Sequence, residues 1–189
     1  MPASGQFGES VRESIGASIA VKQQLLADHD LIAKVSRVTG ILIDAFRAGN
    51  KVVLFGNGGS AADAQHIAAE FVGRFAFDRP ALPALALSVN TSCVTAIGIS
   101  TSGKSANVLR GMATAKKIGL HTVGLAGSGG GALAGAVDHC ICAPSSETPR
   151  IQECHILIGH IISELVEQTI FHEESSLSRS RRSHQPKSS

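Results

Sequence analysis

The 189-residue chain has no tryptophan and no tyrosine, and its aromatic residues are seven phenylalanines. Proteins that read single-stranded nucleic acid stack its bases on aromatic side chains, so we expect no nucleic-acid partner. No apolar stretch approaches the roughly 20 residues that cross a bilayer, and residues 1–20 lack the apolar run of a secretory signal. We therefore expect no membrane partner and a cytoplasmic location.

The cysteines also lack a paired pattern, because no C-x-x-C motif joins Cys93, Cys140, Cys142 and Cys154. Such cysteines are typical of reduced, mostly buried thiols in a cytosolic protein. Cys140 and Cys142 could ligate a metal, but a buried strand with both thiols on one face explains their spacing better.

Charge is scarce as well, at 17% of residues, and the net charge of +2 comes from one end of the chain. Residues 173–189 hold four basic and two acidic residues among serines, with few apolar ones. We predict a disordered basic tail over 173–189. Apolar residues make up 43% of the whole chain, which is enough to form a core. We predict one domain over residues 1–172.

The apolar pattern predicts two helices within residues 8–49, interrupted near Asp28 and ended by Gly49. Short apolar runs then alternate with Gly/Ser loops and helical patterns, up to a last helix over 150–171. This order predicts an α/β fold with a mostly parallel sheet covered on both faces. The predicted strands lie at 52–55, 85–87, 97–99, 121–125 and 137–142.

The first Gly/Ser loop, residues 56–61, fits the dinucleotide fingerprint G-x-G-x-x-A. That site also needs a carboxylate near the end of the second strand to hold the ribose. Here the second strand ends in Ser88-Val89-Asn90, so the sequence disfavours a dinucleotide.

The second loop, residues 98–105, matches the P-loop pattern G-x-x-x-x-G-K-S. A P-loop nucleotidase also needs a strand ending in Asp for magnesium, and no predicted strand ends that way. Hydroxyls and backbone N–H groups around Ser100, Thr101, Ser102 and Ser105 could instead hold one phosphate monoester of a sugar. A structural turn remains open for either loop, but two such loops in one sheet make it less plausible.

His66 and Glu70 lie four residues apart on a predicted helix, and Gln152 and His160 lie eight apart on the last one. Each spacing places the pair on one helix face, where it could bind a divalent metal or transfer protons. Solvated surface residues are the alternative for each pair alone. His155 fits the spacing as well as His160 does.

Together, these segments resemble the phosphoheptose isomerases of the sugar isomerase (SIS) family. The resemblance reaches nearly to Phe171 and implies a three-layer SIS fold with N-terminal helices. It also implies conversion of sedoheptulose 7-phosphate to D-glycero-D-manno-heptose 7-phosphate through an enediol, for bacterial surface glycans. Family members are cytoplasmic homotetramers that use zinc at sites between subunits. The matching stretches are 56–66 with Glu70 and Phe71, 77–80, 99–105, and 148–153 with His160 and Glu164.

The resemblance also implies residue roles, including the choice of His160 over His155. Glu70 and His160 would exchange protons with the substrate. One zinc ion per subunit would be held by His66, Glu70, Gln152 and His160. The sugar would contact Asn57, Gly58, Gly59, Ser60, Glu70 and Gln152, and the phosphate would contact Ser100, Thr101, Ser102 and Ser105.

A second class with this fold lacks the metal residues and binds the bacterial replication initiator protein. It is the alternative function, but the presence of His66, Glu70 and His160 favours the enzyme.

The chain departs from the family between Gly98 and Ile99. There the family has an Asn-Asp pair that contacts substrate, a helix, a loop and a strand. About 25 residues are missing, more than the roughly 10–12 of a minimal parallel crossover. We expect a domain without that helix and strand, and weak or absent activity unless the sheet re-registers.

Overall fold

The computed structural model describes residues 4–73, 79–86 and 93–182. In this part of the chain, helices and strands alternate after an N-terminal helical pair. The elements are α1 (Ser4–Ala27), α2 (His29–Arg47), β1 (Lys51–Gly56), α3 (Gly59–Val72), β2 (Ala84–Ala86), β3 (Cys93–Ser100), α4 (Ala106–Lys117), β4 (His121–Ala126), α5 (Gly131–Ala136), β5 (His139–Cys142) and α6 (Thr148–Arg182). Within residues 4–73, 79–86 and 93–182, none of the helices could serve as a membrane span.

The five strands form one parallel sheet in the order β2-β1-β3-β4-β5. The chain runs from β1 outward to β2 and then returns to β3 on the other side of β1. The strand order therefore reverses between β1 and β3, and α/β proteins bind ligands at the carboxyl edge of such a switch point. The two Gly/Ser loops follow these two strands.

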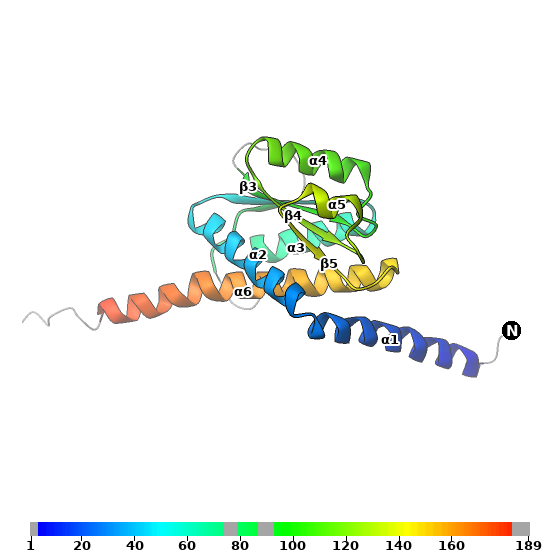
Figure 1. The fold of residues 1–189 in the computed structure, drawn as a ribbon. Coiled ribbons are helices and arrows are strands. Elements are labelled where there is room, and N and C mark those ends of the chain that lie inside the picture. The colour runs from blue at the N-terminus through cyan, green and yellow to red at the C-terminus, as the bar shows by residue number, and fades with distance from the viewer. Residues whose placement is uncertain (1–3, 74–78, 87–92, 183–189) are drawn as a thin grey trace, which may run out of the picture.

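Helices cover both faces of the sheet, which gives the expected three layers (Figure 1). One core lies between the sheet and α2, α3 and α6, and includes Leu54, Ile97 and Val123. The second core, under α4 and α5, includes Val108 and Met112. Burial of both strand faces explains why the apolar runs are continuous rather than alternating.

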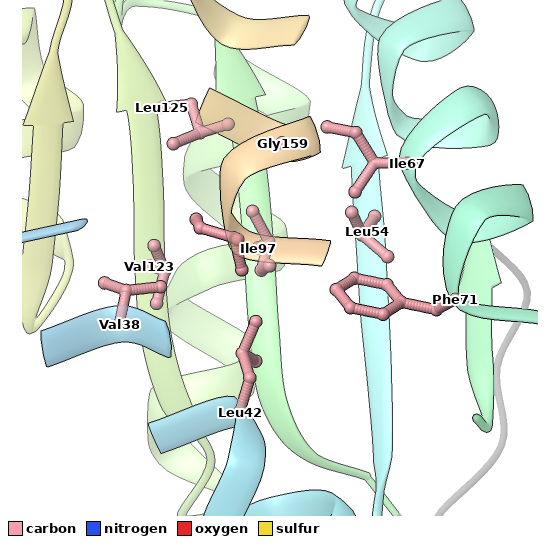
Figure 2. A pocket seen from close by; sticks show the side chains of 10 residues that line it. Val38, Leu42, Leu54, Ile67, Phe71, Ile97, Val123, Leu125 and Gly159 are labelled. Carbon is pink, nitrogen blue, oxygen red and sulfur yellow. The ribbon is translucent and has the colours of Figure 1, made fainter. Parts of the chain in front are cut away.

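The first core contains a small void of about 10 Å³, which Phe71, Leu54 and their neighbours face in Figure 2. Its lining is apolar, so it offers a water molecule no hydrogen-bond partner. The void is a packing gap and not a ligand site. Its lining consists of Val38, Leu42, Leu54, Ile67, Phe71, Ile97, Val123, Leu125, Gly159 and Ile162.

The break predicted near Asp28 separates α1 from α2. The Asp28 carboxylate accepts a hydrogen bond from the Leu31 amide at 2.9 Å and caps α2. Gly49 follows the end of α2 with φ of 75°, which glycine adopts without steric cost. α1 extends away from the sheet in Figure 1.

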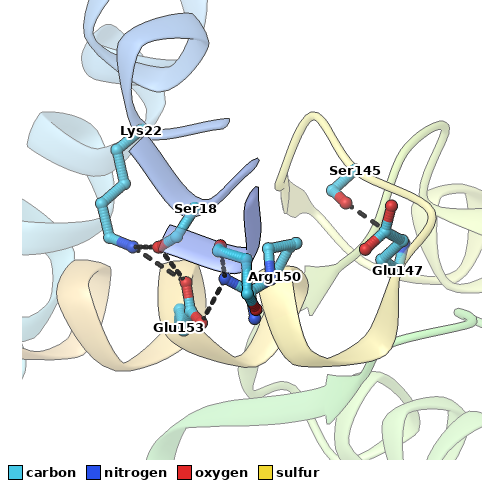
Figure 3. Close-up of polar contacts among 7 residues, drawn as sticks. Ser18, Lys22, Ser145, Glu147, Arg150 and Glu153 are labelled. Atoms are coloured by element: carbon cyan, nitrogen blue, oxygen red, sulfur yellow. Dashed lines mark hydrogen bonds and ion pairs between the residues drawn. The ribbon is translucent and has the colours of Figure 1, made fainter. Parts of the chain in front are cut away.

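Polar contacts connect α1 to the start of α6 (Figure 3). Lys22 Nζ lies 2.9 Å from the Glu153 carboxylate, and Ser18 donates a hydrogen bond to the same oxygen. Arg150 donates to the Ser14 carbonyl at 3.0 Å. These contacts are at least partly exposed, so each contributes little to stability.

β3 passes through Gly98 and Ile99 without a break, and it pairs with β1 and β4 on both sides of that junction. β3 begins at Cys93, so residues 93–96 lengthen the strand predicted at 97–99. Among the residues that the structure describes, no helix lies between β2 and β3.

Two predicted boundaries differ from the observed ones. β5 begins at His139 rather than at 137. Just before it, the Asp138 amide donates to the Thr122 carbonyl and the Asp138 carboxylate accepts a hydrogen bond from the Thr122 amide. α6 does not end near Phe171 but runs on to Arg182, so the expected disordered tail is helical as far as that residue. Residues 172–182 contain no glycine or proline to stop the helix. Residues 183–189 lie outside the described part.

Candidate active site

The two Gly/Ser loops lie side by side at the switch point, joined by a pair of amides. Asn57 Nδ2 donates to Asn107 Oδ1 at 2.7 Å, and Asn107 Nδ2 donates to Asn57 Oδ1 at 2.6 Å. Asn57 lies in the first loop, and Asn107 lies in the first turn of α4. Asn107 was not predicted as a site residue, because its pairing with Asn57 depends on β1 and β3 being neighbours in the sheet.

The second loop forms a tight polar turn before α4. The Gly103 amide donates to the Ser100 carbonyl at 2.9 Å, the Ser100 and Ser105 hydroxyls are 2.9 Å apart, and the Lys104 amide donates to the Ser102 hydroxyl. Ser102 is exposed and Ser100 is buried. The loop places hydroxyls beside the free N–H groups of the α4 N-terminus, an arrangement that suits a phosphate group.

Glycine is required at position 103. Its φ is 63°, and a Cβ there would lie 2.0 Å from the Gly130 carbonyl oxygen. The turn before α5 therefore packs directly against the second Gly/Ser loop, residues 98–105.

The first loop presents Asn57, Gly58 and Gly59 at the surface, but Ser60 is buried. The Ser60 amide donates to the Asn57 carbonyl at 3.0 Å, which closes the loop onto α3. In this structure Ser60 therefore supports the loop from within.

His66 and Glu70 on α3 come together with His160 on α6. His66 Nε2 lies 2.8 Å from His160 Nε2 and 3.4 Å from a Glu70 carboxylate oxygen. One ligand atom from each residue lies within 4.8 Å of the other two. Two imidazoles and a carboxylate at this separation are a donor set that suits zinc and related transition metals.

Gln152, the fourth expected ligand, lies against the first loop. A Cβ at Gly59 would be 1.9 Å from Gln152 Nε2, so only glycine leaves room for this side chain. α6 thus brings Gln152 to the first loop and His160 to the α3 cluster.

The structure separates His155 from His160. His155 is fully buried, its Nε2 lies 3.2 Å from the Ala126 carbonyl oxygen, and its Nδ1 has no hydrogen-bond partner. Burial lowers the pKa of His155 to about 4, so this imidazole is neutral at physiological pH. His155 is a core residue, whereas His160 lies in the cluster.

A buried carboxyl lies next to the cluster. Asp63 precedes His66 by three residues on α3, is buried, and has one carboxylate oxygen without a hydrogen-bond partner. Burial raises the pKa of Asp63, and the nearby His66 opposes that shift. The sequence analysis missed this residue, although its three-residue spacing from His66 places both on one helix face.

Arg79 was also missed as part of the site. Its guanidinium donates to the Glu70 and Phe71 carbonyl oxygens at 2.7 and 2.8 Å, which satisfies the C-terminal end of α3. Its Nε lies 2.5 Å from the Glu167 carboxylate on α6, and both side chains are almost completely buried. Arg79 therefore ties the helix that carries Glu70 to the helix that carries His160.

Comparison with known proteins identifies the family. The chain is 47% identical to the phosphoheptose isomerase of Aneurinibacillus thermoaerophilus, over 87% of this chain and 96% of that protein. It is 45% identical to the phosphoheptose isomerase of Sulfurimonas denitrificans, over 85% of this chain and 95% of that protein. The chain belongs to the phosphoheptose isomerase family.

Solved structures agree with this assignment to the phosphoheptose isomerases. The phosphoheptose isomerase of Neisseria gonorrhoeae superposes with a TM-score of 0.76 at 30% identity, over 86% of this chain and 99% of that one. The Francisella tularensis enzyme gives a TM-score of 0.77 at 25% identity, over 85% of this chain and 97% of that one. The fold is therefore the SIS fold, and the chain is an aldose–ketose isomerase by family.

The comparisons also reveal a gap relative to other phosphoheptose isomerases. The alignment with the Aneurinibacillus enzyme spans 190 positions, but 87% of this 189-residue chain is only about 164 residues. About 26 of those positions thus have no counterpart here. The family model for the SIS domain matches residues 19–99 and stops at Ile99, next to the Gly98–Ile99 junction.

The comparisons do not support the alternative of a non-catalytic replication-initiator partner. The related proteins described above are named isomerases, and the cluster of His66, Glu70 and His160 is present.

Proposed function

We propose that this chain isomerises sedoheptulose 7-phosphate to D-glycero-D-manno-heptose 7-phosphate, a precursor of bacterial surface glycans. The observation that carries the proposal is that His66, Glu70 and His160 lie within 4.8 Å of one another, on the helix that follows the first loop and on α6, which also brings Gln152 to that loop. The names of the related proteins support the substrate.

In this proposal the second loop holds the phosphate and the first loop holds the sugar. Ser102 and the half-buried Thr101 and Ser105 offer hydroxyls, and the buried Ser100 aligns Ser105. Asn57, Gly58, Gly59 and Gln152 contact the sugar hydroxyls, and Ser60 keeps their loop in shape.

Glu70 and His160 form the proton-transfer pair. One of them removes a proton from C1 of the ketose and the other protonates the C2 oxygen, which gives the enediol. Return of a proton to C2 and loss of the C1 hydroxyl proton give the aldose. Arg79 donates a hydrogen bond to the Glu70 backbone carbonyl and so holds the backbone at Glu70 in place.

We propose one zinc ion per subunit, held by His66, Glu70, Gln152 and His160. Two imidazoles and a carboxylate already lie within 4.8 Å of one another, which supports a transition metal. When bound, zinc supplies Lewis-acid polarisation of the substrate oxygens.

We also propose a cytoplasmic homotetramer with sites between subunits. An apolar row on α1 supports self-association, since these large side chains are half exposed or more. Three further apolar side chains on α6 are more than a third exposed. The α1 row is Val11, Ile15, Ile19 and Leu26, and the α6 residues are Leu157, Ile161 and Leu165.

We propose that the missing segment does not remove activity. β3 is continuous, so the Ser-Thr-Ser loop follows a fully paired strand and lies beside the first loop. The absence of the family's Asn-Asp pair is expected to raise KM.

The test is turnover of sedoheptulose 7-phosphate by zinc-loaded protein, followed by NMR of the sugar. We expect turnover by the unmodified chain, none by Glu70→Gln or His160→Gln, and a raised KM for Ser102→Ala. Ser36→Ala, an exposed serine on α2, is the matched control and should behave as the unmodified chain.

Absence of turnover in a folded, zinc-loaded protein would contradict the proposal. Thermal unfolding provides a second measurement, in which sedoheptulose 7-phosphate should stabilise the protein and ATP with magnesium should not. The reverse result would favour the P-loop interpretation of residues 98–105.

A further inference from the structure

Cys140 and Cys142 form a pair of thiols on β5, at the edge of the sheet opposite β2. They are alternate residues of one strand, so they share a face, and their sulfur atoms lie 3.7 Å apart. Both are half-buried, whereas Cys154 on α6 is fully buried. The His66–Glu70–His160 cluster involves neither thiol.

Both sulfur atoms lie close to the backbone of Gly130. A Cβ at Gly130 would be 3.0 Å from Cys142 Sγ and 3.4 Å from Cys140 Sγ. Gly130 adopts φ of 71°, which favours glycine, and the Ala134 methyl group lies on the same side. Cys140 also packs against the second core. The carbonyl oxygen of Gly130 also packs against Gly103 of the second Gly/Ser loop.

A disulfide does not fit this pair. Alternate residues of a strand project their side chains in nearly the same direction, so their Cβ atoms are also about 6.6 Å apart. A disulfide brings its two Cβ atoms to about 3.8 Å. Closing the bond would buckle β5, which pairs with β4 from His139 to Cys142. The two sulfurs are therefore held near each other but kept from bonding.

A thiophilic metal ion fits the same geometry. In a tetrahedral site with metal–sulfur bonds of about 2.3 Å, two thiolates lie about 3.8 Å apart. That separation agrees with the observed 3.7 Å between the sulfur atoms. We propose that Cys140 and Cys142 form a bidentate dithiolate site for a soft divalent cation of the zinc and cadmium class, completed by solvent ligands.

The ionisation of the pair supports this site. The hydrogen bond with Cys140 and the charge of Lys34 lower the pKa of Cys142 to about 7, against the effect of burial. The same hydrogen bond and burial raise the pKa of Cys140. A cation bound to both sulfur atoms displaces the thiol protons, so binding strengthens as pH rises.

The experiment is a titration with cadmium of protein that carries one equivalent of zinc per chain, read by the ultraviolet thiolate-to-cadmium charge-transfer absorption. We expect about one equivalent of the absorbing complex per chain, with release of protons as the ion binds. Cys140→Ser and Cys142→Ser should each remove most of the absorption. Cys140→Ala and Cys142→Ala repeat the test without a hydroxyl.

Two controls separate this site from the others. Cys93→Ser and Cys154→Ser should keep the absorption, because neither residue belongs to the pair. His160→Gln should also keep it, so the result does not depend on the proposed isomerase site. No absorption in the unmodified protein, or absorption that survives in the double variant Cys140→Ser/Cys142→Ser, would overturn the proposal.

Discussion

His155 and His160 lie five positions apart on α6, and their surroundings give them different chemistry. His155 is enclosed by the core and reaches only a backbone carbonyl, so it is held as the neutral imidazole. His160 is partly exposed beside His66, where it can exchange a proton or bind a metal. Burial, which spacing along the helix does not reveal, decides between the two roles.

The low pKa of His155 makes the protein less stable in mild acid. Between pH 6.5 and 4 the unfolded chain binds a proton on this residue that the folded chain does not, so stability falls as pH is lowered. The loss reaches about 3.5 kcal/mol once pH is well below 4, at about 1.4 kcal/mol for each unit by which the pKa is lowered. Urea unfolding at pH 7.5 and 4.5 should show roughly 2.5 kcal/mol of it.

The matched control is His155→Gln, which cannot titrate. Its stability should fall less than that of the unmodified protein over the same interval. Equal losses for the two proteins would show that His155 does not contribute.

Gly59 is the second residue whose identity the site depends on. In Gly59→Ala the new Cβ would meet Gln152 Nε2, the end of a flexible side chain, so Gln152 should move while the fold is kept. We expect a higher KM and weaker zinc retention with little change in thermal stability. Gly40→Ala on α2, where a Cβ has open space, is the control and should leave both unchanged.

Unchanged KM and zinc retention in Gly59→Ala would show that Gln152 has no part in the site. A large loss of stability in Gly59→Ala would instead mean that the loop backbone needs glycine for reasons beyond this contact.

At the scale of elements, two helices build the metal cluster and one buried ion pair joins them. Arg79 and Glu167 have exposed side-chain fractions of 1% and 0%, so their interaction is weakly screened by solvent. Arg79 also packs on Phe171, with its guanidinium 5.6 Å from the ring centre. The spacing between α3 and α6 at the cluster therefore depends on this pair.

Removal of one partner should be costly, because the other charge remains buried. We expect Arg79→Met to lower the free energy of unfolding by about 3–5 kcal/mol, measured in urea. The exposed pair Lys116–Asp138 provides the comparison, since Lys116→Met should cost about 1 kcal/mol or less. Similar costs for the two variants would contradict the structural role assigned to Arg79.

The sequence predicted elements well where the pattern was local. The five strands, the break at Asp28 and the cluster of His66 with Glu70 all follow from periodicity or helical spacing. It missed the pairing of Arg79 with Glu167 and of Asn57 with Asn107, because each joins residues at least 50 positions apart. Such contacts depend on strand order and helix packing.

β3 shows a different limit of the sequence analysis. Only residues 97–99 were predicted as strand, because the polar Thr95 interrupts the apolar run. In the structure Thr95 is fully buried and pairs with Val52 and His121, so tertiary pairing overrides its polarity. The strand that spans the shortened region could be recognised only in the sheet.

At the scale of the whole molecule, α1 offers the strongest test of assembly. We expect Ile15→Lys/Ile19→Lys to shift the protein toward smaller species in analytical ultracentrifugation, because charges would enter the proposed interface. Gln23→Lys, which adds a charge at an exposed polar position of the same helix, should leave the assembly unchanged. An unaltered mass for the double variant would exclude this face of α1 from the interface.

The exposed apolar row on α1 also bears on how the melting temperature depends on protein concentration. If subunits bury it against one another, part of the folding free energy comes from association, and the law of mass action ties the melting temperature to protein concentration. Two preparations of identical sequence and buffer would then melt at different temperatures when one is more dilute. Comparisons of variants therefore require equal subunit concentration.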